Sequence, residues 1–259
     1  MTNGDEPLAG RVALVTGGGR GIGRAISLAL ASDGADVVVN YRRDREAADQ
    51  TVADVEALGR RAVAVQASVD QLEDCRALAA AAVEFGDVDI LVHNGGIASR
   101  GQSVARTEPD ELERVVRTHA LGPHHLTQAL VGELRSHDRS DVVFISSVAT
   151  LTNGAYGAPY NMGKAAMEAL ALTLAKEELR HGMHVNIVAP GVVDTLMGQK
   201  LMKAVAGVDD IHQLDASMPF GRVCAPTDVA DVVRWLVGPT AAYVTGQKIN
   251  VDALASSLR

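Results

Sequence analysis

The chain alternates short apolar, β-branched runs with longer Ala-rich amphipathic stretches along most of its length. The short runs cover residues 11–15, 36–40, 61–66, 88–92, 141–146, 183–188 and 247–251. Helical candidates lie near 21–33, 44–58, 70–85, 108–135, 156–181 and 226–237. Runs such as VALV and VVFI are apolar throughout, which is typical of strands covered on both faces. The alternation predicts an α/β fold with a seven-stranded, doubly wound parallel sheet and helices on both faces.

Composition favours one domain and excludes several classes of partner. No shift in composition divides the 259 residues, so we predict a single domain over 1–259. A net charge of −8 argues against a nucleic-acid or anionic membrane partner. Cys75 and Cys224 have no partner pattern, which predicts neither a disulfide framework nor a Cys-based metal site. With a polar start and no long apolar run, these features favour the cytoplasm.

The least regular stretch is 191–225, which contains four glycines and a proline. Long irregular segments in compact α/β domains are usually functional, so we predict a substrate lid here. A surface excursion without function is the alternative.

A glycine-rich run, TGGGRGIG at 16–23, follows the first strand run and opens the first helix. Gly17 permits a tight turn, Gly21 lets the backbone approach a pyrophosphate, and Gly23 allows the helix to pack closely on the strand. The helix N-terminus adds free N–H donors. The run predicts a dinucleotide-binding turn, with a merely tight turn as the alternative. The residues expected to bind the cofactor here are Gly17, Gly19, Arg20, Gly21, Ile22 and Gly23.

The end of the second strand run indicates which nicotinamide cofactor binds. An Asp or Glu there would bind the ribose 2′-hydroxyl and repel a 2′-phosphate, but this chain has Asn40. Tyr41, Arg42 and Arg43 follow, and with Arg20 they would form a cationic pocket suited to a phosphate monoester. We therefore predict NADPH rather than NADH, with one of the two adjacent arginines merely facing solvent.

Tyr160 and Lys164 are four residues apart and share one face of the helix expected at 156–181. Ser147 follows the VVFIS run, at the sheet edge where ligands of such folds bind. A nearby ammonium favours the phenolate, so Tyr160 could exchange a proton with an oxygen that Ser147 holds. In isolation the pair could also be a surface Tyr beside a Lys.

Five motifs in order resemble the classical short-chain dehydrogenase/reductases over residues 8–252. They are TGGGRGIG, Asn94-Gly95-Gly96, ISS with Tyr160 thirteen residues beyond Ser147, YNMGK, and Pro190-Gly191 followed by Thr195. VNYRR and YVTGQKINVD are most similar to the 3-oxoacyl-thioester and polyketide ketoreductase branch. The resemblance implies a Rossmann-type domain that binds a nicotinamide cofactor.

The resemblance also implies a role for each matching residue. Tyr160 would be the general acid, Lys164 would lower its pKa and bind the nicotinamide ribose, and Ser147 would orient the substrate oxygen. Asn94 would support the adenosine side, and Thr195 with the nearby backbone would hold the carboxamide. The other cofactor positions implied are Ser68, Val69, Gly95, Gly96, Pro190, Gly191 and Val193.

His119 stands where the family usually has an Asn that holds a water molecule on the proton path to the Lys. His119 would keep that water, add a titrating relay, or mark a weakened relay. We favour retained function, because Ser147, Tyr160 and Lys164 are all present. His93 also departs from the family pattern, and we interpret it as a strand-end residue without ligand contact.

These features predict an NADPH-dependent ketoreductase that acts on a ketone or 3-oxoacyl group, including polyketides. One alternative is an NAD(P)-linked alcohol or sugar dehydrogenase of the same family. Another is a non-catalytic cofactor-binding regulatory protein, prompted by His119. The resemblance implies a homotetramer or homodimer, and no His or carboxylate spacing indicates a metal site.

Overall fold

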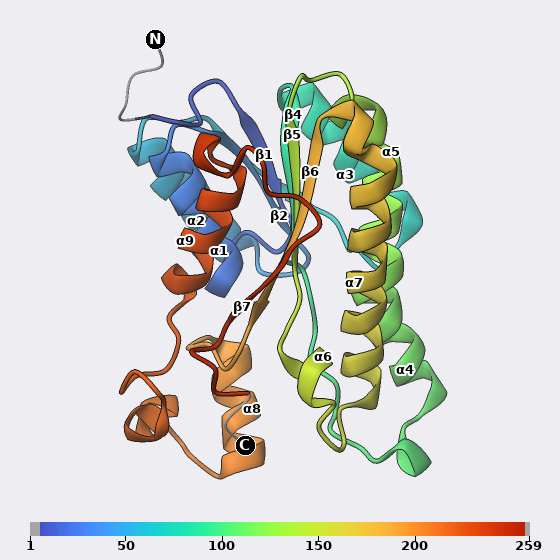
Figure 1. Ribbon diagram of the computed structural model, residues 1–259, viewed down its shortest axis with the longest axis vertical. Helices are drawn as coiled ribbons and strands as arrows, with labels where there is room; N and C mark the ends of the chain where they lie inside the picture. Colours follow the sequence, from blue (N-terminus) through green and yellow to red (C-terminus); the bar gives the residue numbers. More distant parts are fainter. Residues whose placement is uncertain (1–5, 257–259) are drawn as a thin grey trace.

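A computed structural model describes residues 6–256, and within this part seven parallel strands form one sheet in the order β3-β2-β1-β4-β5-β6-β7 (Figure 1). The strands are β1 (Val12–Val15), β2 (Asp36–Tyr41), β3 (Ala62–Gln66), β4 (Val88–His93), β5 (Ser140–Ile145), β6 (Met183–Pro190) and β7 (Lys248–Val251). The predicted doubly wound α/β fold is confirmed.

Helices cover both faces of the sheet. The α-helices are α1 (Gly21–Ser32), α2 (Arg45–Ala57), α3 (Leu72–Phe85), α4 (Pro109–Val116), α5 (Gly122–Leu134), α6 (Ala149–Thr152), α7 (Ala158–Glu178), α8 (Leu196–Ala206) and α9 (Pro226–Val237). A π-helical turn, η2 (Arg117–Leu121), separates α4 from α5. Short 3₁₀ turns are η1 (Val104–Arg106), η3 (Leu179–His181), η4 (Ile211–Ser217) and η5 (Pro239–Ala241).

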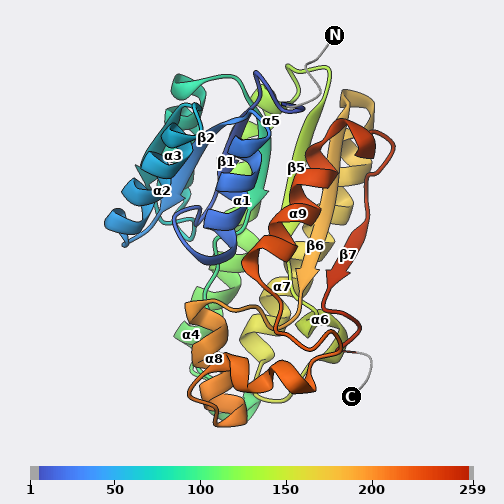
Figure 2. The same ribbon diagram turned by 90° about the vertical axis from the view of Figure 1, so that its left-hand side faces the viewer.

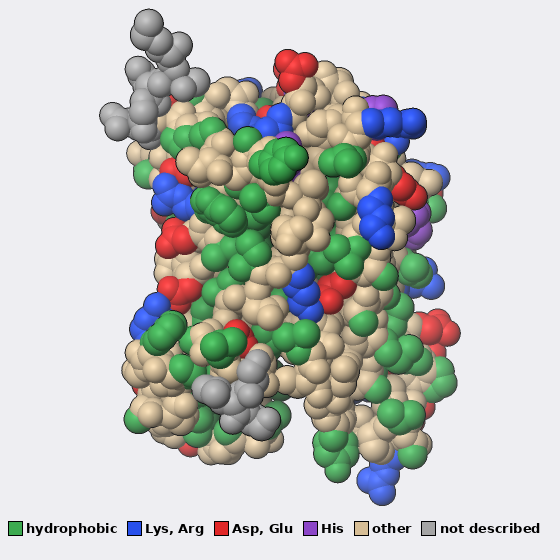
Figure 3. Space-filling view, in the orientation of Figure 1, with side chains coloured by type: hydrophobic (Ala, Val, Ile, Leu, Met, Phe, Trp, Pro, Cys, Tyr) green, Lys and Arg blue, Asp and Glu red, His purple; other side chains and the backbone are tan. Residues whose placement is uncertain are grey.

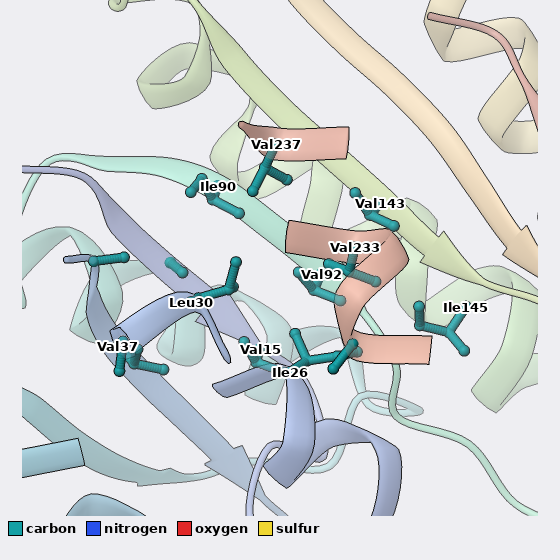
Figure 4. Close-up of a cluster of buried hydrophobic side chains, with 14 of the residues drawn as sticks. Val15, Ile26, Leu30, Val37, Ile90, Val92, Val143, Ile145, Val233 and Val237 are labelled. Atoms are coloured by element: carbon teal, nitrogen blue, oxygen red, sulfur yellow. The ribbon is translucent and has the colours of Figure 1, made fainter. Parts of the chain in front are cut away.

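The strands are apolar throughout because each sends alternate side chains into two separate cores. In β1, Ala13 and Val15 join the core beneath α1, α2 and α9, whereas Val12 and Leu14 join the core beneath α3, α5 and α7. Figure 4 shows part of the first core, where side chains of α1 and α9 meet those of the central strands. Two-sided burial thus accounts for the runs seen in the sequence.

The strand order reverses beside β1, which pairs with β2 on one side and β4 on the other. Ligands of open α/β sheets bind at such a switch point, outside the carboxyl ends of the strands. Figure 2 shows α4, α6 and α8 lying beyond these ends. Among the described residues, we find no helix with the length and apolar character needed to span a bilayer.

Two segments differ from the predicted elements. The single helix expected at 108–135 is divided by η2, because Pro123 lacks the N–H that an α-helix would donate to the carbonyl of His119. The extra residue per turn accommodates this loss, and the N–H of Gly122 bonds to the carbonyl of Arg117. The irregular stretch 191–225 contains α8 and η4, so it is more ordered than its glycines indicate.

Candidate active site

The turn between β1 and α1 forms a narrow cradle of backbone. Gly17 and Gly21 have φ values of +61° and +53°, a region that favours glycine. A Cβ on Gly23 would lie 2.1 Å from the carbonyl oxygen of Gly17, and one on Gly19 would lie 2.9 Å from Cα of Ala48. No side chain among the described residues caps the start of α1, and its first turn holds no acidic residue. Its N–H groups are therefore available to an anion.

Thr16, which the sequence prediction did not include among the site residues, ties this turn to the end of β4. Its Oγ1 accepts hydrogen bonds from the backbone N–H groups of Asn94 and Gly95, both at 2.9 Å, and donates to the carbonyl of Val92 at 3.2 Å. The amide of Asn94 donates back to the carbonyls of Thr16 and Gly17 at 2.9 and 3.2 Å. The position of Thr16 directly after the first strand run is the sequence feature that could have indicated this role. These bonds fix the Gly-rich turn against the turn that contains Asn94, Gly95 and Gly96.

Asn40 is buried and supports the cradle from β2. Its amide donates to the carbonyls of Val65 and Ala67 at 3.2 and 3.1 Å and accepts from the N–H of Gly17 at 3.3 Å. Ser68 similarly directs its hydroxyl to Asp70 at 2.7 Å. The Asn40 amide therefore holds backbone groups inside the protein, whereas the Ser68 hydroxyl bonds to the side chain of Asp70.

The end of β2 leads to exposed guanidinium groups. Strand β2 extends through Tyr41, one residue further than predicted, and Arg42 and Arg43 follow as exposed residues. Arg20 lies 3.4 Å from the carboxylate of Asp44, which caps α2. The predicted cationic cluster therefore includes one acidic neighbour, and Arg42 and Arg43 carry most of its unpaired charge.

Ser147, Tyr160 and Lys164 converge where β5 ends. Ser147 follows β5 and precedes α6, whereas Tyr160 and Lys164 lie in the first two turns of α7. Lys164 is buried, and its Nζ donates to the carbonyl of Ile145 at 2.6 Å. The same Nζ lies 5.7 Å from the centroid of the Tyr160 ring. The three residues that the motifs indicated are thus brought together, and Tyr160 as a whole residue is half-buried.

Burial dominates the ionisation of this group. It lowers the pKa of Lys164 to about 7, although the charge of Glu168 opposes the shift. It also raises the pKa of Tyr160, and a hydrogen bond with Ser147 offsets only part of that rise. Desolvation of the phenolate is the largest effect, so the net shift of the Tyr160 pKa is upward. That Lys164 lowers this pKa stays a prediction. Tyr160 carries its proton at neutral pH.

His119 lies in the π turn, almost fully buried, with its ring edge-on to Tyr160 at a centroid distance of 5.1 Å. Its Nε2 contacts the backbone of Ile97 at two points, 2.7 Å from the carbonyl oxygen and 3.3 Å from the N–H. Nδ1 is buried without a partner among the described residues. Burial, and the nearby charge of Lys164, lower the pKa of His119 to about 3. The ring is therefore neutral at neutral pH, which argues against the titrating relay.

The segment after β6 closes the other side of the cradle. Thr195 caps the N-terminus of α8, and its Oγ1 accepts a hydrogen bond from the N–H of Gly198 at 3.0 Å. A Cβ on Gly21 would lie 3.3 Å from Cγ2 of Thr195, so the two predicted cofactor segments face each other. Val193 bridges to Cys224 and thereby ties the two ends of the 191–225 stretch together.

Comparison with known proteins agrees with this geometry. The sequence model described as short chain dehydrogenase matches residues 11–206. The chain belongs to this family. A 3-oxoacyl-[acyl-carrier-protein] reductase of Synechocystis sp. is 36% identical over 247 residues, which cover 95% of this chain and 96% of the relative. An L-rhamnose 1-dehydrogenase (NAD(P)(+)) of Sphingomonas sp. is 34% identical over 247 residues, again 95% and 96% of the two chains.

A solved structure shares the fold of this short chain dehydrogenase closely. The angucycline C-6 ketoreductase LanV with bound NADP has a TM-score of 0.86 at 30% identity, covering 96% of this chain and 98% of that one. The resemblance to the 3-oxoacyl reductase and polyketide ketoreductase branch is confirmed. The protein is an NAD(P)-dependent oxidoreductase of the class that interconverts CH–OH and carbonyl groups.

The cradle of this dehydrogenase fits the pyrophosphate of a dinucleotide. Two of its glycines exclude a side chain, and the uncapped start of α1 offers N–H donors to an anion. His93 stacks on Phe144 and lies 2.9 Å from the hydroxyl of Thr127, so it packs inside the fold as its strand-end interpretation requires. Within residues 6–256, no three or more His, Cys, Asp or Glu side chains are grouped to hold a metal ion.

Proposed function

We propose that this short chain dehydrogenase is an NADPH-dependent ketoreductase that reduces a ketone or 3-oxoacyl group to the alcohol, with Tyr160 as proton donor. The observation that carries the proposal is the convergence of Ser147, Tyr160 and Lys164 where β5 ends, with a raised pKa for the Tyr160 phenol. A protonated phenol is the form that reduction needs, because the substrate oxygen must gain a proton.

The chain's own residues divide the work at the substrate oxygen. Bound NADPH would supply the hydride that forms the new C–H bond. Ser147 donates a hydrogen bond to the carbonyl oxygen and orients it, and Tyr160 gives that oxygen its proton as the C=O double bond becomes single. The ammonium form of Lys164 then stabilises the phenolate left on Tyr160. Neutral His119 packs against Tyr160 and keeps that side of the ring free of a second charge.

Two features support NADPH and an apolar substrate. The exposed Arg42 and Arg43 follow β2, which ends in Asn40 and Tyr41 instead of the Asp or Glu that would repel a 2′-phosphate. The nearby carboxylate of Asp44 is 3.4 Å from the guanidinium of Arg20 and caps α2. None of the described residues of α8 is buried, and Met197 and Leu201 are 42% and 48% exposed. These side chains support the prediction that 191–225 is a lid over an acyl chain or polycyclic ketone.

The test compares wild-type protein with Tyr160→Phe, using NADPH consumption with a panel of ketones and 3-oxoacyl thioesters. General acid catalysis contributes about 10²- to 10⁴-fold, so the variant should lose at least about a hundredfold in kcat while its Kd for NADPH stays within about twofold. Tyr243→Phe is the matched control, because Tyr243 is fully exposed and precedes β7 at the opposite end of the sheet. Near-wild-type reduction by Tyr160→Phe would refute the proposal.

The second candidate is the reverse reaction, oxidation of an alcohol or sugar with NAD(P)+. The identity with the L-rhamnose 1-dehydrogenase favours it. Rates measured in both directions at neutral pH distinguish the two. The regulatory alternative predicts cofactor binding with no turnover in either direction.

The assembly and location of the enzyme remain predictions. We expect a homotetramer or homodimer, in which α4, α5 and α7 pair across a two-fold axis, and a cytoplasmic location. Light scattering tests the first and cell fractionation the second. A monomeric mass would contradict the expected assembly.

A further inference from the structure

An ion pair joins β7 to α7 directly behind the segment that carries Ser147. Glu168 lies on α7 one turn after Lys164, and its carboxylate is 2.8 Å from Nζ of Lys248 on β7. The two side chains are only 15% and 22% exposed, so solvent and salt screen the pair less than a surface pair. Figure 3 shows Lys or Arg and Asp or Glu side chains side by side near the middle of this face of the molecule, among hydrophobic side chains.

The same carboxylate accepts hydrogen bonds from both sides of Ser147. The Ser146 hydroxyl donates to Oε1 of Glu168 at 2.5 Å, and the Thr150 hydroxyl lies 2.9 Å from the same atom. Nζ of Lys248 donates to Oγ1 of Thr150 at 2.7 Å. Segment 146–150 is therefore held before and after Ser147 by one ion pair.

We propose that Glu168 and Lys248 are positioning residues that hold segment 146–150 so that the Ser147 hydroxyl faces Tyr160. The inference rests on the proposed function, in which Ser147 orients the substrate oxygen. A displacement of about 1 Å in a group that orients the substrate can lower the rate about a hundredfold. Contacts that fix the position of Ser147 would therefore affect catalysis.

The charge of Glu168 also acts on Lys164. The groups that face Lys164 are the carbonyl of Ile145 on β5, Tyr160 on α7, neutral His119 on η2, and Glu168 with its partner Lys248. Glu168 opposes the lowering of the Lys164 pKa. Removing the Glu168 charge therefore lowers the pKa of Lys164 further. Removing the Lys248 charge raises it, because Glu168 is then no longer balanced.

The experiment compares Glu168→Gln and Lys248→Met with the matched control Glu178→Gln. Glu178 lies on the same helix about 15 Å further along, is buried, and accepts two hydrogen bonds from Arg135 at 2.6 and 2.7 Å. We expect kcat for carbonyl reduction to fall about tenfold to a hundredfold in the two test variants. The control should stay within about twofold of wild type, because its ion pair does not contact segment 146–150.

Two readouts separate positioning from a merely structural role. In a Ser147→Ala background, and at a pH below the alkaline limb of both variants, Glu168→Gln should cause little further loss of kcat, because the group that it positions is gone. The alkaline limb of kcat against pH should move to lower pH in Glu168→Gln and to higher pH in Lys248→Met. A structural role alone would shift neither limb.

Hydrogen exchange gives a readout that does not depend on turnover. Segment 146–150 of the cofactor-free protein should exchange faster in both test variants and at the wild-type rate in Glu178→Gln. If Glu168→Gln or Lys248→Met fails to fold, Thr150→Val is measured in its place, because it removes the Thr150 hydroxyl that contacts both Glu168 and Lys248.

Two results would overturn the inference. The first is that folded Glu168→Gln and Lys248→Met have the kcat and the hydrogen-exchange rates of the wild type. The second is that Glu168→Gln lowers kcat as much in the Ser147→Ala background as it does in the wild type. If the wild type reduces no carbonyl compound, the proposed function is refuted. The positioning role of Glu168 and Lys248 in that reaction is then refuted as well, even if hydrogen exchange of segment 146–150 changes as expected.

Discussion

Replacing Gly23 by Ala tests the cofactor cradle at its tightest point. The new Cβ would lie 2.1 Å from the carbonyl oxygen of Gly17 and 2.5 Å from Nδ2 of Asn94. Contacts below about 3 Å are not sustained, so α1 and the turn must separate by about 1 Å. Both atoms belong to backbone or to an amide fixed by Thr16, which leaves no flexible side chain to absorb the change.

The magnitude follows from this overlap. Overpacking of a close contact costs about 1–3 kcal/mol, which corresponds to roughly 2–12 °C in Tm for a chain of this size. A shift of about 1 Å in the N–H donors should weaken NADPH binding by about tenfold to a hundredfold, since each tenfold is about 1.4 kcal/mol.

Fluorescence titration with NADPH and thermal unfolding measure the two effects. Gly132→Ala is the matched control: Gly132 lies in α5, and a Cβ added to it would meet no atom within 4 Å, so the change should stabilise the helix by about 0.5–1 kcal/mol and leave the Kd unchanged. A Kd within about twofold of wild type for Gly23→Ala, at unchanged Tm, would show that the turn is not a tight cradle.

Two further predictions concern charge. Because the pKa of His119 is about 3 in the folded chain against 6.5 when unperturbed, the unfolded chain binds more protons between these pH values, and stability falls as pH drops from 6.5 toward 3. His119→Asn should remove up to about 1.4 kcal/mol per pH unit of this loss, measured by urea unfolding at pH 7 and pH 5; an unaltered pH dependence would contradict the burial argument. The double variant Arg42→Ala/Arg43→Ala should bind NADPH about tenfold more weakly and NADH as tightly as the wild type. The control is Arg45→Ala, which should change neither affinity, because the guanidinium of Arg45 pairs with Asp49. Equal losses of affinity for both cofactors would argue against a 2′-phosphate site.

The strands were predictable because burial on both faces leaves an uninterrupted apolar run. The strand predicted at 88–92 is β4 (Val88–His93) in the structure, and the strand predicted at 61–66 is β3 (Ala62–Gln66). The Gly-rich turn and the Tyr160–Lys164 spacing were predictable for a similar reason, since both depend on neighbours in the sequence.

Contacts between distant residues were not predictable from one sequence. Lys248 and Glu168 are 80 residues apart, and no local pattern reveals that they share Thr150. The inward use of the Asn40 amide depends in the same way on the packing of β3 beside β2. The raised pKa of Tyr160 depends on burial, which a spacing of four residues along a helix does not specify.

The π turn at Arg117–Leu121 also sets the rotational phase between the helices on either side of it. One residue more than an α-helical turn rotates the following face by about 100°, so α4 packs on α7 while α5 packs on α3. The number of residues between α4 and α5 is therefore constrained independently of their identity. Even a chain that kept every side chain named above, but lacked one residue here, would direct the apolar face of α5 away from its core.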